Sequence, residues 1–154
     1  HREQGTPPLL NLETEKTLLH CVLTLIGEGV VQSAHDCSDG GLAVTLAECC
    51  LANPIKSLGA VVRLTAGQLR LDALLFGESQ SRVVLSVSPS HREAVLRKAE
   101  EMGVPAAAIG TVGGERLVID VEAGKRAGAC RIDADVKTLQ ESWSLSLERT
   151  LEGE

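Results

Sequence analysis

The sequence predicts an α+β fold, with a mixed β-sheet of five or six strands and about four helices packed on it. The length of 154 residues and the apolar share of 44% are typical of one globular domain with a substantial core. Some segments repeat apolar residues at helical spacing, whereas others are short and rich in valine and leucine. The two kinds of segment do not alternate strictly, so a doubly wound parallel sheet is not expected.

The elements can be placed by apolar spacing and by the residues that begin and end helices and strands. In chain order, the expected elements are a linker over 1–8, a helix between Asn11 and Gly27, a strand over 30–35, a helix over 42–52, a strand over 58–64, a short helix and a polar loop within 67–79, a strand over 82–88, a helix over 90–102, strands over 106–112, 117–121 and 129–132, and a closing helix over 136–151.

The first helices have clear local signals. Pro7 and Pro8 lack backbone donors and disfavour helix in the residue before each, so a helix is expected only after them, where Asn11 can cap it. Its predicted apolar face consists of Leu18, Leu19, Val22, Leu23 and Ile26. The second helix is expected to end at Asn53 and Pro54, with one face formed by Leu42, Leu46, Cys49 and Cys50.

The second half of the chain has equally local signals. Ser90 and Glu93 have the spacing of a capping box that opens a helix, and Gly103 follows its end. Gly113 and Gly114 separate two apolar segments, which predicts a tight hairpin turn. The closing helix is expected to be amphipathic, with an apolar face of Val136, Leu139, Trp143, Leu147 and Leu151.

Composition excludes several classes of function. The net charge is −6, and Phe76 and Trp143 are the only aromatic residues, so the basic stripe and stacking platform of a nucleic-acid-binding protein are missing. No apolar run approaches the roughly 20 residues that span a bilayer, and the polar start carries no apolar signal segment, so a cytoplasmic protein is expected. The five cysteines form no C-x-x-C pair, and most are expected to be small buried side chains.

The stretch SAHDCSDGGLA is the most informative motif. It places His35, Asp36 and Asp39 where a strand meets a helix, followed by Gly40 and Gly41, whose amides can approach an anion closely. The two carboxylates would repel a bare phosphate, so a divalent cation such as Mg²⁺ is expected to bridge them. The alternative is structural: Ser38 or Asp39 is the helix cap, which we prefer for these two residues, and the glycines form a turn. That alternative leaves Asp36 unexplained.

The stretch FGESQSR is the second candidate. It places Glu78, Ser79, Ser81 and Arg82 just before a buried strand, where polar groups often line a ligand site. A simple ion pair of Glu78 with Arg82 is the alternative, and Arg82 is predicted to hold Glu78 beside the first motif. The serines do not form a nucleophile elbow, because the second glycine is missing. A third stretch, GTVGGER, lacks the lysine of a P-loop and is assigned to the hairpin.

Taken together, SAHDCSDGGLAVTLAE, LFGESQSRVVLSV, AAIGTVGGERLVI and a final helix with Trp143 resemble the C-terminal domain of the phosphoribosylformylglycinamidine synthase family. This family lies in the superfamily related to aminoimidazole ribonucleotide synthetase. The resemblance implies that residues 9–154 are a single C-terminal-type synthetase domain and a fragment of a longer chain. The longer enzymes are ATP-dependent, amidine-forming carbon-nitrogen ligases of purine biosynthesis that convert formylglycinamide ribonucleotide, using ammonia from glutamine.

The resemblance also implies ligands and partners. Mg²⁺ and ATP or ADP are the expected cofactors of the full enzyme, with Asp36 as the metal ligand. The partners implied are the other synthetase domains, a glutaminase and a ribonucleotide substrate; no nucleic acid and no membrane are expected. Catalytic residues remain unassigned, and residues near the nucleotide or phosphate are His35, Ser38, Asp39, Gly40, Gly41, Glu78, Ser79, Ser81 and Arg82.

Two functional hypotheses therefore stand beside each other. In the first, the domain contributes part of a ligase active site. In the second, it is a non-catalytic assembly module that packs against sister domains and the glutaminase. By itself, the chain is expected to fold, to lack ligase activity and to form a dimer through an exposed apolar patch.

Overall fold

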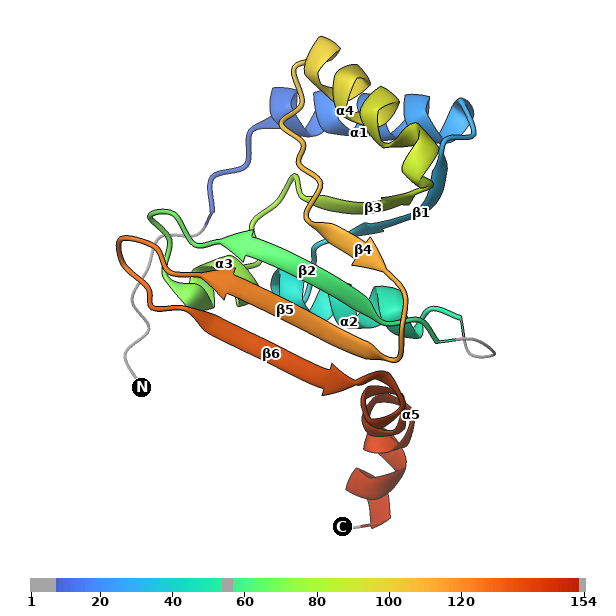
Figure 1. The fold of residues 1–154 in the computed structure, drawn as a ribbon, viewed down its shortest axis with the longest axis vertical. Coiled ribbons are helices and arrows are strands. Elements are labelled where there is room, and N and C mark those ends of the chain that lie inside the picture. The colour runs from blue at the N-terminus through green and yellow to red at the C-terminus, as the bar shows by residue number, and fades with distance from the viewer. Residues whose placement is uncertain (1–7, 54–56, 153–154) are drawn as a thin grey trace. The chain divides into compact units, whose positions relative to one another are not determined.

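The computed structural model of the chain describes residues 8–53 and 57–152, without the side chains of 147–149 and 152 (Figure 1). All but one residue of the predicted linker, and Pro54 at the predicted end of the second helix, lie outside the described residues. The elements are α1 (Leu12–Gly27), β1 (Val31–Asp36), α2 (Gly41–Leu51), β2 (Ala60–Thr65), α3 (Leu71–Phe76), β3 (Val83–Val87), the 3₁₀ turn η1 (Pro89–His91), α4 (Arg92–Glu101), β4 (Gly110–Val112), β5 (Arg116–Glu122), β6 (Cys130–Asp135) and α5 (Val136–Glu152).

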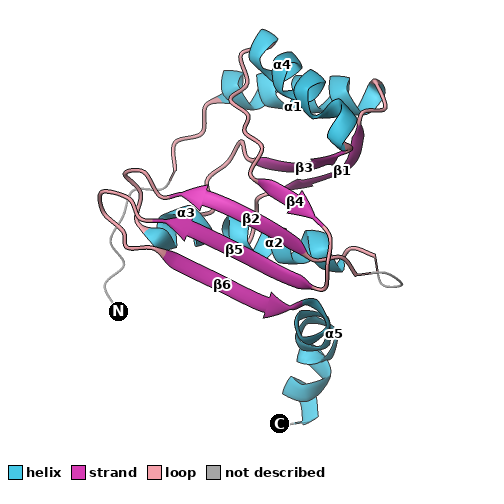
Figure 2. Ribbon diagram, in the orientation of Figure 1, coloured by secondary structure: helices cyan, strands magenta, loops and turns pink. Residues whose placement is uncertain are grey.

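These elements confirm the predicted α+β class, with six strands and five α-helices among the described residues. The strands are divided between a two-stranded sheet and a four-stranded sheet rather than joined in one (Figure 2). The chain accordingly forms two compact units. The first unit contains the chain up to Gly41 together with Glu78–Ala108, and the second contains Leu42–Gly77 and Ile109–Glu154. A single domain over 9–154 remains a prediction.

The first unit is a two-stranded sheet with two helices. Strands β1 and β3 pair antiparallel, with Asp36 opposite Val83 at one end. Helices α1 and α4 lie side by side in this unit (Figure 1). Its small core consists of Cys21, Leu25, Val95 and Ala99.

Helix α1 confirms the predicted cap and corrects the predicted apolar face. The Asn11 side chain accepts hydrogen bonds from the backbone N–H groups of Glu13 and Thr14, both at 3.1 Å. The buried residues are Cys21 and Leu25, which lie one helical turn apart and face the α4 side of the core. The predicted face was wrong in part, because three of its members lie on another side of the helix and remain exposed: Leu19, Leu23 and Ile26.

Helix α4 ends where predicted but begins differently. Glu101 is its last residue, and Gly103 follows at a φ of +72°. The predicted capping box is not formed, because η1 precedes the helix and the Ser90 hydroxyl bonds that of Ser88 at 2.9 Å. The Glu93 carboxylate instead accepts from Arg92. The side chains of Ser90 and Glu93 therefore bond neighbouring side chains instead of the backbone N–H groups that a capping box would satisfy.

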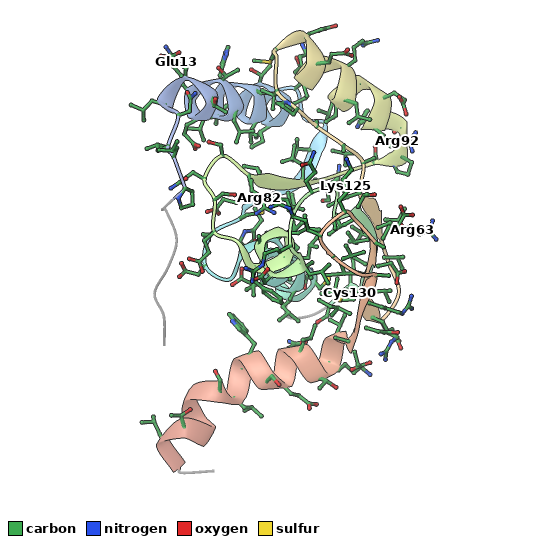
Figure 3. All side chains as sticks on the ribbon, turned by 90° about the vertical axis from the view of Figure 1, so that its left-hand side faces the viewer. Glu13, Arg63, Arg82, Arg92, Lys125 and Cys130 are labelled. Atoms are coloured by element: carbon green, nitrogen blue, oxygen red, sulfur yellow. The ribbon has the colours of Figure 1, made fainter. Side chains whose placement is uncertain are left out.

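The second unit is built on the four-stranded sheet, in the order β4-β2-β5-β6. Strands β2 and β5 are parallel, and the other neighbours are antiparallel. Helices α2 and α3 cover one face of this sheet (Figure 1). Because side chains alternate along a strand, three residues of β5 share one face of the sheet. These residues are Leu117, Ile119 and Val121, all buried. The other face carries charged residues, including Arg63, which points away from the two helices (Figure 3).

The predicted hairpin at Gly113 and Gly114 was wrong. Strands β4 and β5 do not pair, because β2 lies between them and pairs with both. The two glycines turn around the start of β2 instead: Gly113 N–H donates to the Gly59 carbonyl at 2.7 Å, and Gly59 N–H donates to that of Gly114 at 2.9 Å. The predicted strand over 106–112 shortens to the three residues of β4.

Helix α5 forms as predicted, but its apolar face is only partly buried. Val136 is buried at its start, whereas Trp143 is 66% exposed and Leu151 is more exposed still. The side chain of Leu147 lies outside the described residues. The five cysteines are all thiols, and three of them are buried, as expected for most of them: Cys21, Cys37 and Cys50. Among the described residues, no helix combines the length and apolarity of a membrane span.

Candidate functional site

The two polar motifs come together in the first unit. Because β1 and β3 are antiparallel, the end of β1 lies beside the start of β3. Gly40 N–H donates to the Glu78 carboxylate at 2.8 Å, and Cys37 N–H donates to the Arg82 carbonyl at 2.9 Å. Residues 35–41 and 78–82, far apart in sequence, thus form one structural feature, here called the loop pair.

The end of β1 presents an exposed carboxylate. The Asp36 side chain is 74% exposed and that of His35 is 32% exposed. Cys37, which lies between these two residues and the turn, is buried. His35 Nδ1 lies 2.7 Å from the Asp36 carbonyl oxygen, which accepts the bond when Nδ1 carries the proton. This contact fixes the orientation of the imidazole beside the carboxylate. Ser38 and Asp39 are exposed in the turn that follows.

The glycine amides are already engaged. Gly40 and Gly41 have φ values of +77° and +66°, which suit residues without a side chain. Gly40 N–H binds Glu78, as above, and Gly41 N–H donates to the Ser38 carbonyl at 3.0 Å. The anion at the Gly40 amide is therefore the Glu78 carboxylate. A phosphate could bind these amides only by displacing Glu78 and opening the turn.

The second half of the loop pair contains a backbone conformation that serine rarely adopts. Ser81 has a φ of +60°, and among the described residues it is the only non-glycine with positive φ. Its hydroxyl donates to the carboxylate of Glu15 on α1. Sequence analysis missed Glu15, because it belongs to neither motif and its partner lies 66 residues away. Arg82 follows directly and lies on the segment that enters β3 (Figure 3).

The charges of the loop pair favour a cation. Three carboxylates, those of Asp36, Asp39 and Glu78, accompany the single guanidinium of Arg82. Among the residues that the structure describes, no three His, Cys, Asp or Glu side chains are grouped to hold a metal ion by themselves. Mg²⁺, however, often binds one or two carboxylates and completes its shell with water and phosphate oxygens. The exposed Asp36 carboxylate fits such a role in its donor chemistry.

Several polar side chains of the loop pair are exposed, among them Asp36, Asp39 and Glu78. Two grooves of about 590 and 400 Å³ occur elsewhere in the first unit, one between α4 and residues 103–107 and the other beside α1 and Met102. Neither is lined by a residue of the loop pair.

Known proteins resemble this chain in sequence and in fold. Residues 1–122 match the family model of the AIR synthase related protein, C-terminal domain. The chain is 50% identical over 117 residues to phosphoribosylformylglycinamidine synthase subunit PurL of Moorella thermoacetica, covering 76% of this chain and 15% of that protein. It is 45% identical over 140 residues to PurL of Caldanaerobacter subterraneus, covering 91% of this chain and 18% of that protein.

Solved structures give the same result. Thermotoga maritima PurL complexed with FGAR has a TM-score of 0.62 and 26% identity, covering 82% of this chain and 21% of that one. The complex of that PurL with AMPPCP has a TM-score of 0.61 and 26% identity, covering 81% and 21%. The structure named PurLQS, also from Thermotoga maritima, has the same score and identity, covering 82% and 21%.

These similarities confirm the resemblance found in the motifs. The chain spans less than a fifth of the length of the two curated relatives, and the matched model covers residues 1–122, which include the entire loop pair. The chain therefore belongs to the family of AIR synthase related proteins, as a C-terminal domain of that family.

Proposed function

We propose that the chain acts as the C-terminal domain of a PurL-type phosphoribosylformylglycinamidine synthase. The complete enzyme would use ATP to activate the amide oxygen of formylglycinamide ribonucleotide, after which ammonia from glutamine displaces phosphate and leaves the amidine. The hydrogen bond between Gly40 and Glu78 carries the proposal, since it unites the two family motifs at one place. A PurL structure with FGAR and another with AMPPCP, an ATP analogue, support the substrate classes.

Within this proposal, each part of the loop pair has a distinct role. Asp36 would hold Mg²⁺, because its carboxylate is the exposed one at the strand end. When bound, the metal would neutralise phosphate oxygens of the nucleotide. Arg82 supplies a permanent positive charge with paired donors for a phosphate oxygen. Glu78, Gly40 and Gly41 shape the turn, because their polar groups bind one another and Ser38.

The remaining predicted residues surround the nucleotide site that we propose at the loop pair. His35 stands beside Asp36, and its imidazole is oriented by the Asp36 carbonyl. Ser38, Asp39 and Ser79 would provide polar groups around the nucleotide, whereas Ser81 faces Glu15. We expect the enzyme in the cytoplasm, together with its other synthetase domains and a glutaminase; the structure named PurLQS supports an assembly of this kind.

One observation favours the alternative, in which the domain is a non-catalytic assembly module. Both glycine amides are engaged, as expected of a site that holds a nucleotide structurally or not at all. Occupancy separates the two hypotheses. A nucleotide complex of the complete synthetase would show metal at Asp36 in the first case and none within coordination distance in the second.

Self-association of the isolated chain is a further part of the proposal. Helix α1 exposes an apolar stripe at helical spacing, made of Leu12, Leu19, Leu23 and Ile26. Such a stripe favours a symmetric contact between two copies. Sedimentation velocity should show a concentration-dependent dimer that Leu23→Gln weakens. A monomer at all concentrations would contradict this part.

The test of function replaces the aligned segment of Moorella thermoacetica PurL by this chain. We expect the chimera to release ADP only when formylglycinamide ribonucleotide and ammonium are both supplied. Asp36→Asn should raise the KM for Mg-ATP about tenfold, since an anionic ligand beside a dication becomes neutral. The matched control is Asp72→Asn. Asp72 is an exposed carboxylate of the second unit, so its substitution removes the same charge.

Three outcomes decide between the hypotheses. An inactive but folded chimera would reject the assignment to this enzyme. An active chimera with equal KM values for Asp36→Asn and its control would reject the metal-ligand role and favour the assembly module. Turnover by the 154-residue chain alone, with ammonium, would show that the chemistry does not need the remainder of the synthetase.

A further inference from the structure

Ser81 holds a conformation that its own side chain disfavours. At a φ of +60° its backbone is in the left-handed region, where a β-carbon crowds the chain and glycine is the usual occupant. Such residues persist when surrounding contacts hold them, and they concentrate at functional sites. Ser81 lies between Ser79 and Arg82 in the loop pair, so the direction of the chain at Ser81 determines how Arg82 enters β3.

The contact that holds Ser81 comes from outside the loop pair. Its hydroxyl donates to the carboxylate of Glu15, in the first turns of α1, and both side chains are half-buried. A hydrogen bond to an ionised carboxylate is stronger than one between neutral groups. Helix α1 is a firm support, because Asn11 caps its start while Cys21 and Leu25 anchor it in the core of the first unit.

The position of Ser81 affects hydrogen bonds on both sides of the loop pair. On one side Arg82 follows, and its carbonyl accepts the Cys37 N–H at 2.9 Å. On the other side Glu78 lies three residues earlier, and its carboxylate accepts the Gly40 N–H at 2.8 Å. These bonds connect α1, residues 78–82 and residues 35–41 in one continuous series.

We propose that Glu15 is a positioning residue: through Ser81 it holds residues 78–82 in the conformation in which Glu78 and Arg82 fix the turn after Asp36. The ligand consequence, a Mg-nucleotide bound at that turn, rests on the proposed function. Glu15 itself touches neither metal nor nucleotide in this proposal.

The first test needs no ligand. Hydrogen exchange of the Gly40 amide, followed by NMR on the chain, reports the bond to Glu78 directly. Glu15→Ala should accelerate this exchange about tenfold, as expected for the loss of one hydrogen bond to a charged group. Glu15→Gln keeps an acceptor and should restore most of the protection. The amide of Ala99, a buried residue inside helix α4 of the same unit, serves as the internal reference for general unfolding.

A matched variant separates positioning from helix stability. Glu13 lies on the same helix, in its first turn, and is exposed, so Glu13→Ala changes the charge at the helix start without touching Ser81. It should leave Gly40 exchange unchanged. Ser81→Ala should act like Glu15→Ala, and the double variant should add nothing further. Equal exchange at Gly40 in Glu15→Ala and the parent chain, or additive effects in the double variant, would overturn the proposal.

The second test measures the functional consequence in the active chimera. Glu15→Ala should raise the KM for Mg-ATP while Glu15→Gln remains near the parent value. A faster Gly40 exchange with an unchanged KM would confirm that Glu15 positions the loop pair and would count against nucleotide binding there. Failure of the proposed function is thereby distinguished from failure of the positioning role.

Discussion

The two units of the molecule hold their structure by different means. In the second unit, a four-stranded sheet buries a continuous set of apolar side chains, with Ile119 fully buried in the middle of β5. In the first unit, two strands and two helices enclose a small core cluster of four buried residues, surrounded by partly buried neighbours. The loop pair belongs to this first unit and is positioned by polar bonds to single atoms.

This difference explains where a binding surface can be placed. A large apolar core tolerates little change in shape, because packing is dense and non-directional. Polar bonds are directional, so a few of them can set loops such as 35–41 and 78–82 without a large core beneath them. The expectation is that changes in the second unit affect global stability most, whereas changes at the loop pair affect local exchange and binding.

The largest expected effect tests the two cores against each other. Ile119→Ala should lower the free energy of unfolding by about 4 kcal/mol, because the cavity would lie against a hydrogen-bonded sheet that cannot collapse into it. Leu25→Ala in the first unit should cost about 2–3 kcal/mol, since its partly buried neighbours can relax toward the cavity. Urea unfolding followed by circular dichroism measures both. Equal losses would refute the distinction between the two cores.

The next effect concerns the close passage of the chain around β2. A β-carbon on Gly59 would lie 2.3 Å from the carbonyl oxygen of Arg116, so Gly59→Ala must displace backbone. We expect a loss of about 2 kcal/mol, typical of overpacking. The control is Gly27→Ala at the end of α1, where no atom lies within 4 Å and helix propensity improves. A thermal melt in which both variants match the parent would contradict the described passage.

A smaller effect distinguishes the cap that forms from the cap that does not. Asn11→Ala should cost about 1 kcal/mol, because two N–H groups at the start of α1 lose their acceptor. Ser90→Ala should cost clearly less, because the Ser90 side chain is exposed and its hydroxyl bonds a side chain, that of Ser88, instead of capping the helix. Parallel urea titrations compare them. A larger loss for Ser90→Ala would restore the capping box that the sequence predicted.

The smallest effect is a dependence of stability on pH in the second unit. Burial, and secondarily the neighbouring Cys49, raise the pKa of the Cys50 thiol from 9.0 to about 11. The folded state therefore retains this proton when the unfolded state has lost it. The stabilising contribution is complete below pH 9.0 and is lost as the pH rises through about 11.

Two measurements check this dependence. Cys50→Ala should flatten the stability profile above pH 9 relative to the parent, and at pH 8 a thiol reagent should modify the less buried Cys49 and Cys130 before Cys50. Labelling of Cys50 at the rate of Cys130 would show that its thiol is more accessible than the fold implies.

The comparison also shows where sequence analysis succeeds. Caps, glycines and apolar spacing act over a few residues, which is why α1 after Asn11, α2, α4 and five of the six strands were predicted close to their observed places. Sequence analysis failed where a local turn signal conflicts with the way the strands pair. Gly113 and Gly114 look like a hairpin by themselves, and only the insertion of β2 between β4 and β5 changes their role.

By itself, the sequence determined the α+β class, most elements and the two polar motifs, because each depends on residues near one another along the chain. Only the tertiary structure decided which leucines of α1 are buried, that Glu78 bonds Gly40, and that Glu15 bonds Ser81. The reason is physical: bonds across 38 and 66 residues depend on how the strands pair and the helices pack, and such contacts leave no periodic or capping signal in the local sequence.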